Sequence, residues 1–191
     1  WITFVDTPGH EAFSAMRERG VSIADIAVLV VAADDGVRPQ TKEVINYLKE
    51  KKMPVIVAIN KVDKPDANIV KVKQELADNG IVIEEWGGEV IAVEVSAKQG
   101  IGIDKLLEDI LLVNEVEEFK ADFKRNGLAI ILEAHLDPKK GPVATVLVKT
   151  GTLKVGQDIL AGSASGRIRK MEDFAGKNIN LAEPSMPVTI M

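Results

Sequence analysis

Short, nearly continuous apolar runs alternate with longer amphipathic runs through about residue 119. The apolar runs are rich in Val and Ile, and they are Ile2–Val5, Ile26–Ala33, Val55–Ile59 and Val90–Val95. Strands that are buried on both faces of a parallel sheet have this composition, because neither face alternates with polar side chains. The pattern therefore predicts four strands of a mostly parallel sheet.

Amphipathic segments follow these strands and predict helices. They are Glu11–Arg19, Gln40–Lys52, Ala67–Asn79 and Asp104–Phe119. The first is expected to end at Gly20 and the third at Gly80, since glycine commonly follows the last turn of a helix. Strands that alternate with helices in this way predict a doubly wound α/β domain with helices on both faces of the sheet.

The pattern changes after Lys120–Asn126, a short polar stretch. Beyond it the apolar runs are short and extended, and Gly and Pro turn signals separate Leu128–Leu136, Ala144–Lys149, Asp158–Ala161 and Arg167–Met171. Short strands at this spacing predict a small antiparallel β-barrel. We expect an α/β domain over 1–120, a linker over 121–127, and a barrel domain over 128–191 that is truncated at its C-terminus.

Composition narrows the class of protein. The 191 residues include 46% hydrophobic and 28% charged residues, which is ordinary for a globular protein, and no apolar run reaches the length of about 18 residues that spans a bilayer. Cysteine is absent, which excludes disulfides and cysteine zinc sites and agrees with a cytoplasmic location. The net charge of −5 argues against the whole chain being a nucleic-acid binder.

A local basic segment remains a candidate for RNA contact. Basic and apolar residues alternate over Gly166–Lys170, so Arg167 and Arg169 are predicted to share one strand face, with Lys170 beside them. Such a face can meet RNA phosphates, and it can equally be a solvated strand face.

The run Asp6-Thr7-Pro8-Gly9-His10 follows the first apolar run. Ligands of open α/β sheets bind beyond the carboxyl ends of the strands. There Asp6 can hold a magnesium ion through water, Gly9 can bring a backbone N–H close to a terminal phosphate, and His10 can orient an attacking water. A simple turn that uses Pro and Gly is the alternative.

Two further polar clusters follow later strands. Asn60-Lys61-Val62-Asp63 follows the third, and Ser96-Ala97-Lys98 follows the fourth. The Asp63 carboxylate can accept hydrogen bonds from guanine N1–H and the N2 amino group, which adenine cannot offer. Asn60 can bond the base, and the Lys61 stem can lie across it. The Ala97 N–H can donate to guanine O6 while Lys98 covers the other side.

With these motifs the chain resembles bacterial translation initiation factor two, a family of translational GTPases. The likeness is carried by Thr7–Gly20, Ala32–Thr41, Glu84–Gly88, Gly141–Val146 and Gly151–Leu153. The resemblance implies a P-loop-type GTPase domain followed by a β-barrel, with GTP or GDP and Mg2+ as ligands.

The resemblance also assigns roles. Asp6 would lie near magnesium, Gly9 would sense the γ-phosphate, and His10 would be catalytic. Thr7, Pro8, Asn60, Lys61, Asp63, Ser96, Ala97 and Lys98 would complete the nucleotide site. The implied partners are the small ribosomal subunit, the GTPase-activating region of the large subunit, and initiator tRNA through domains outside this chain. No membrane partner is implied.

One departure from the family is plain: no run of the form GxxxxGK[ST] occurs in the 191 residues. This loop cradles the phosphates in such sites. We therefore expect the chain to be a fragment without its phosphate loop and inactive as a GTPase by itself. Two alternatives stay open at this point. One is another translational GTPase, such as an elongation or selenocysteine-specific factor, and the other is a non-catalytic module that binds RNA or protein.

Overall fold

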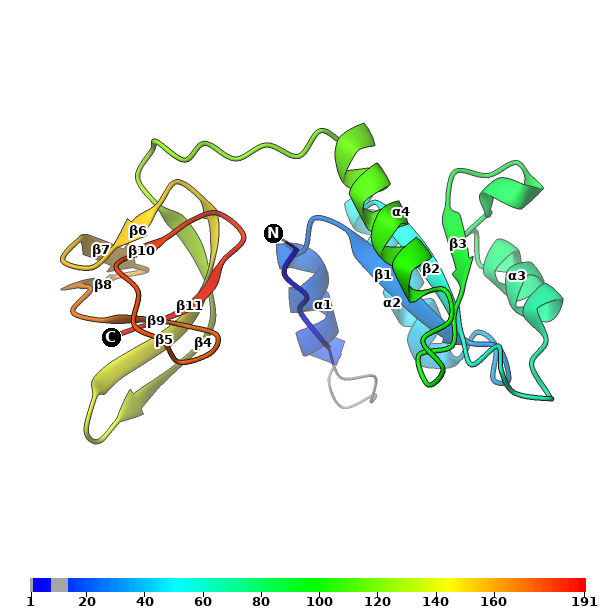
Figure 1. Ribbon diagram of the computed structural model, residues 1–191, viewed down its shortest axis with the longest axis horizontal. Helices are drawn as coiled ribbons and strands as arrows, with labels where there is room; N and C mark the ends of the chain where they lie inside the picture. Colours follow the sequence, from blue (N-terminus) through cyan, green and yellow to red (C-terminus); the bar gives the residue numbers. More distant parts are fainter. Residues whose placement is uncertain (1, 8–13) are drawn as a thin grey trace. The chain divides into compact units, whose positions relative to one another are not determined.

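The computed structural model describes residues 2–7 and 14–191. The chain divides into two compact units, one of them Val5–Phe119 and the other Lys120–Met191 together with the first four residues. The first combines helices with a parallel sheet, and the second contains only strands and connections among its described residues (Figure 1).

The sheet of the α/β unit has three parallel strands in the order β1 (Ala27–Ala32), β2 (Val55–Asn60) and β3 (Ile91–Glu94). Ala32 pairs with Asn60 and Ile59 pairs with Glu94. The carboxyl ends of all three strands therefore lie along one edge of the sheet. These strands confirm three of the four that the hydrophobic pattern predicts.

The helices of this unit are α1 (Ser14–Ile23), α2 (Pro39–Lys51), α3 (Ile69–Asp78) and α4 (Ile103–Val116), with a 3-10 turn η2 (Glu84–Trp86) before β3. The last three predicted helices are confirmed within a few residues. Pro39 occupies the first turn of α2, and Lys52 in a left-handed conformation ends it. The Asn68 side chain caps α3 by accepting a hydrogen bond from the Lys71 N–H at 3.0 Å.

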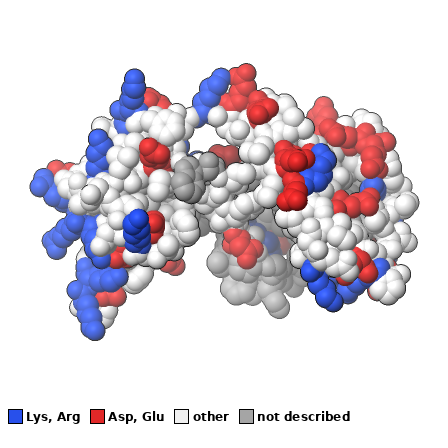
Figure 2. All heavy atoms as spheres, viewed as in Figure 1, with Lys and Arg blue, Asp and Glu red and all other residues white. Residues whose placement is uncertain are grey.

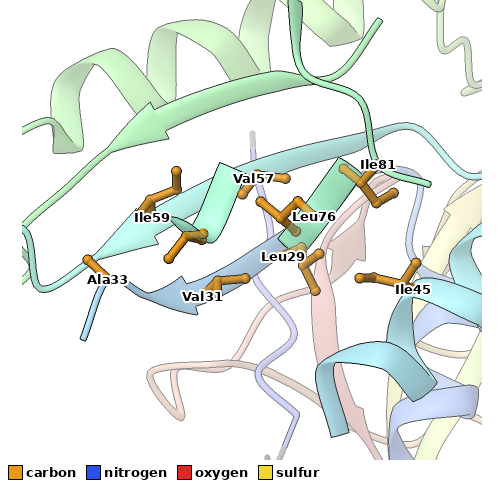
Figure 3. Close-up of a cluster of buried hydrophobic side chains, with 9 residues drawn as sticks. Leu29, Val31, Ala33, Ile45, Val57, Ile59, Leu76 and Ile81 are labelled. Carbon is orange, nitrogen blue, oxygen red and sulfur yellow. The ribbon is translucent and has the colours of Figure 1, made fainter. Parts of the chain in front are cut away.

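Helices cover both faces of the sheet, which explains why its strands lack polar alternation. On the face toward α2 and α3, the buried cluster comprises Leu29, Val31, Ala33, Ile45, Val57, Ile59, Val72, Leu76 and Ile81 (Figure 3). On the opposite face, Ile56 and Ala58 of β2 belong to a second cluster with Ile110 of α4. Successive residues of β2 thus enter different clusters, as the period of two in a strand requires.

Two predictions near the start of the chain are wrong. Residues 2–5 form no strand, because no described strand pairs with their backbone groups. The side chains of Ile2 and Phe4 are exposed. The first helix does not end at Gly20 but continues to Ile23. A Cβ at buried Gly20 would lie 2.6 Å from Cγ2 of Thr7, so this glycine permits close packing rather than a helix end. The predicted helix start at Glu11 lies outside the described residues.

The second unit is built from antiparallel sheets. Its four-stranded sheet has the order β4 (Leu128–Asp137), β5 (Gly141–Thr150), β11 (Pro187–Ile190) and β9 (Met171–Asp173). Two-stranded sheets pair β6 (Leu153–Lys154) with β10 (Leu181–Ala182) and β7 (Asp158–Ala161) with β8 (Ala164–Arg167). The hydrophobic core of this second unit comprises Val146, Val148, Leu153, Ile168, Met171, Ala182 and Val188.

The predicted strand Arg167–Met171 is wrong as a single element. β8 ends at Arg167 and β9 begins at Met171. Ile168 and Met171 are both buried although they are three residues apart, and one regular strand would direct them to opposite faces. Arg167 and Arg169 therefore do not share a strand face.

Among the described residues, no helix is long and apolar enough to cross a membrane.

Candidate functional site

The polar residues that follow β2 and β3 converge at the carboxyl edge of the sheet. Asn60 ends β2, and its carbonyl accepts a 2.7 Å hydrogen bond from the N–H of Ala33, just beyond β1. The N–H of Val95 donates to the Ile59 carbonyl at 2.8 Å, which extends the pairing of β2 and β3 by one residue. Three loops therefore leave the sheet side by side, and this edge is where open α/β sheets bind ligands.

Asn60 ties two of these loops together. Its Oδ1 accepts hydrogen bonds from the N–H of Lys61 at 2.7 Å and from the N–H of Ala97 at 3.1 Å. Lys61 itself has a left-handed backbone with φ of 64°, which is uncommon for a residue with a side chain. The amide predicted to reach guanine O6 is thus held by Asn60, so a base at this position would share or replace that bond.

Asp63 is held by Ser96. The Ser96 hydroxyl, which is fully buried, donates a 2.6 Å hydrogen bond to Oδ1 of Asp63 and accepts one from the Gln99 N–H at 3.2 Å. The Ser96 bond is the main reason that the pKa of Asp63 lies below its ordinary value, and the charges of Lys98 and Lys64 add to it. The lowered pKa keeps the carboxylate ionised at neutral pH, and the Ser96 bond orients it. Because the residue remains exposed, the carboxylate is also available to a donor.

The Lys61 ammonium lies 3.2 Å from a carboxylate oxygen of Asp34 and 3.2 Å from one of Asp35. Asp34 also binds Lys64, and Asp35 binds Arg38 at 2.5 Å. Asp34 is 9% exposed and the other side chains are more open to solvent. The acidic pair and its three cations form one network between the turn after β1 and the loop after β2.

Electrostatics support this network. The hydrogen bond from Lys64 is the main cause that lowers the pKa of Asp34. The hydrogen bond from Arg38 is the main cause that lowers the pKa of Asp35. Asp34 likewise raises the pKa of Lys61. Asp34 and Asp35 belong to none of the three motifs that the sequence predicts for the site, so sequence reasoning misses this contact. The signal that could have revealed it is the position of the pair directly after β1, beside the strand that carries Asn60.

The first motif is only partly described. Asp6 is exposed and Thr7 is half-buried against Gly20, whereas Pro8, Gly9 and His10 lie outside the described residues. Ala97 and Lys98 are exposed next to buried Ser96. Within residues 2–7 and 14–191, no three His, Cys, Asp or Glu side chains are grouped to hold a metal ion. A single carboxylate such as Asp6 still suits Mg2+, which keeps several waters.

The described part of the site presents one oriented carboxylate and two lysines with long side chains. The carboxylate of Asp63 has the capacity to accept hydrogen bonds from two adjacent donors, and the lysines at 61 and 98 have long apolar stems. Parallel strands with helices on both faces, this polar edge, and a following antiparallel β unit are the features of a translational GTPase.

Comparison with known proteins places the chain within that class. It belongs to the family of the elongation factor Tu GTP-binding domain, which matches residues 1–115, and elongation factor G domain 2 matches residues 127–191. A GTPase domain is therefore followed by the β-barrel domain of translation factors.

Two curated relatives share one name. The chain is 59% identical over 189 residues to translation initiation factor IF-2 of Alkaliphilus metalliredigens and 60% identical over 190 residues to that of Desulforamulus reducens. These matches cover 99% and 100% of the chain but 27% and 19% of the relatives. The chain thus spans less than a third of the length of these relatives.

Solved structures agree on the fold. GDP-bound aIF5B from Aeropyrum pernix superimposes with a TM-score of 0.81 at 25% identity, over 98% of this chain and 40% of that one. Elongation factor SelB from Methanococcus maripaludis, in complex with the GTP analogue GPPNHP, superimposes with a TM-score of 0.75 at 24% identity, over 97% and 41%.

Proposed function

We propose that the chain is the guanine-recognising part of a translation initiation GTPase. In the complete protein this part binds GTP and GDP, and the protein hydrolyses GTP on the ribosome while it promotes initiator-tRNA placement and subunit joining. The observation that carries the proposal is the Asp63 carboxylate, oriented by buried Ser96 beside the Asn60–Ala97 hydrogen bond. The identity of 59–60% to initiation factors favours this function over that of an elongation factor.

In this proposal, each polar residue at the edge has one role. Asp63 accepts the N1–H and N2 amino protons of guanine, and the stems of Lys61 and Lys98 enclose the base. Ala97 N–H and Asn60 share the O6 side. Adenine would leave the desolvated carboxylate without its two donors, so the site discriminates against it.

The reaction itself is assigned to the first motif. Asp6 would hold Mg2+ through water, Thr7, Pro8 and Gly9 would approach the terminal phosphate, and His10 would orient the attacking water. The ion would neutralise charge on the phosphates. We further propose that the 191 residues alone do not hydrolyse GTP, since their sequence has no GxxxxGK[ST] to cradle the phosphates.

The proposed partners are the small ribosomal subunit, the GTPase-activating region of the large subunit, and initiator tRNA through other domains, all in the cytoplasm. Charge supports RNA contact by the β unit. Residues 120–191 contain 11 Lys and Arg against 7 Asp and Glu, whereas residues 5–119 contain 13 against 22. In the face shown by Figure 2, basic side chains gather along the left and lower edges of the β unit, and acidic ones predominate over the α/β unit.

Arg167, Arg169 and Lys170 remain the proposed RNA-contacting residues, although two of them have acidic partners. Arg167 binds Asp158 at 2.9 Å, and Lys170 binds Glu172 at 2.5 Å. Exposed pairs of this kind contribute little to stability, so a phosphate group can compete for either cation.

The proposal is tested by exchanging the base specificity in the complete gene product that contains these residues. Asp63→Asn replaces one acceptor oxygen by an amide donor, which suits the C2 carbonyl of xanthine better than the amino group of guanine. We expect weaker GDP binding by at least about tenfold and a gain in affinity for xanthosine diphosphate, each measured by titration. Asp66→Asn, an exposed acid in the same loop, is the matched control. Unchanged GDP affinity of Asp63→Asn would overturn the proposal.

A further inference from the structure

The acidic pair after β1 contacts the lysine of the proposed base site but does not belong to the recognition motif. Lys61 leaves the loop after β2, and its ammonium ends between Asp34 and Asp35 at 3.2 Å from each. The aliphatic stem therefore runs from the loop of Asn60 and Asp63 toward the turn after β1. Both ends of this side chain are held, the first by its backbone bond to Asn60 and the second by two carboxylates.

The carboxylates are themselves held in place by the fold. The turn that carries them is closed by hydrogen bonds from the N–H groups of Asp35 and Gly36 to the Ala32 carbonyl, at 3.2 and 2.9 Å. Glu75 of α3 accepts a 2.7 Å bond from the Val37 N–H, which ties the turn to a helix. A fixed anchor of this kind restricts a long side chain that would otherwise sample many rotamers.

We propose that Asp34 and Asp35 are positioning residues for guanine binding, because they anchor the Lys61 ammonium and thereby hold its stem as a fixed wall of the base site. This inference rests on the proposed function. A wall that is already ordered loses less conformational entropy when the base binds, so the acidic pair raises affinity without touching the nucleotide. Lys64 and Arg38 share the same carboxylates and balance their charge.

The test is a double-mutant cycle in the complete gene product, with GDP as the probe. Asp34→Asn combined with Asp35→Asn removes the anchor, and Lys61→Met removes the ammonium while keeping an unbranched stem. We expect the paired substitution to weaken GDP binding about fivefold in the natural background, and less than about 1.5-fold when Lys61 is already Met. Asp158→Asn, which breaks an exposed pair with Arg167 in the other unit, is the control.

Each outcome decides the matter. A loss that vanishes in the Lys61→Met background supports positioning through Lys61. An equal loss in both backgrounds overturns it and assigns the acidic pair a purely structural role. No loss in either background also overturns it. If Asp63→Asn leaves base selection unchanged, the proposed function fails instead; if it alters base selection while the cycle shows no coupling, only the positioning role fails. Thermal unfolding of every variant separates a folding defect from either result.

Discussion

Ser96 donates a 2.6 Å hydrogen bond through its hydroxyl to Oδ1 of Asp63, although the two residues are 33 positions apart in the chain. The bond joins the loop after β2 to the loop after β3. It leaves Asp63 exposed but fixed in orientation, while Ser96 itself is fully buried. The serine of the third motif therefore acts on the carboxylate of the second.

Ser96→Ala should raise the pKa of Asp63 toward its ordinary value of 3.8, because the hydroxyl bond is the main cause of the lowered pKa. A 13C NMR titration of the Asp63 carboxyl measures this directly. GDP binding should also weaken, since the carboxylate becomes free to rotate. Thr would keep the hydroxyl, so Ser96→Thr is the matched control. An Asp63 pKa that does not move in Ser96→Ala would contradict the assigned role.

Acid should release the acidic pair after β1. The pKa values of Asp34 and Asp35 are lowered in the folded protein, so their contribution to stability is present above the ordinary value of 3.8 and disappears as the pH falls through the lowered values. Denaturant unfolding of the natural chain and of Asp34→Asn/Asp35→Asn should differ at pH 7, and the difference should shrink below pH 3.8. Lys61, Lys64 and Arg38 stay charged throughout. A difference that is independent of pH would contradict this account.

Gly102→Ala should destabilise the α/β unit much more than Gly100→Ala. Both glycines have positive φ, 72° and 74°, so an alanine at either is strained by about 1–2 kcal/mol. A Cβ at Gly102 would also lie 2.2 Å from the carbonyl oxygen of Glu94, whereas nothing lies within 4 Å of one at Gly100. The clash should add about 1–3 kcal/mol in denaturant unfolding. Equal losses for the two variants would mean that the backbone of β3 and of the start of α4 shifts to accommodate the added methyl group at little cost in stability.

Leu76→Ala should cost about 2–5 kcal/mol of unfolding free energy, because the side chain is fully buried in the cluster between the sheet and α3. Val70→Ala on the same helix is the control, since Val70 is 70% exposed and its truncation should change stability by less than about 0.5 kcal/mol. Denaturant unfolding measures both. Similar losses of unfolding free energy for the two variants would mean that α3 does not pack mainly through Leu76.

Local pattern predicts an element well where that element buries its own apolar face. β2 reads as a continuous apolar run because one helix layer covers Val57 and Ile59 and another covers Ile56 and Ala58. Residues 2–5 have the same local character but form no strand, because a strand also needs a partner for its backbone groups. Gly20 shows a similar limit, since a packing glycine and a helix-ending glycine look alike in sequence.

By itself, the sequence determined the order of elements from β1 to α4 and the three polar motifs, since strand and helix periods and short motifs are local properties of the chain. Only the tertiary structure decided which motif residues touch. Parallel pairing of β1 with β2 places Asp34 and Asp35 against Lys61, and the pairing of β2 with β3 places Ser96 against Asp63. Such contacts depend on strand order and register, which no single segment encodes.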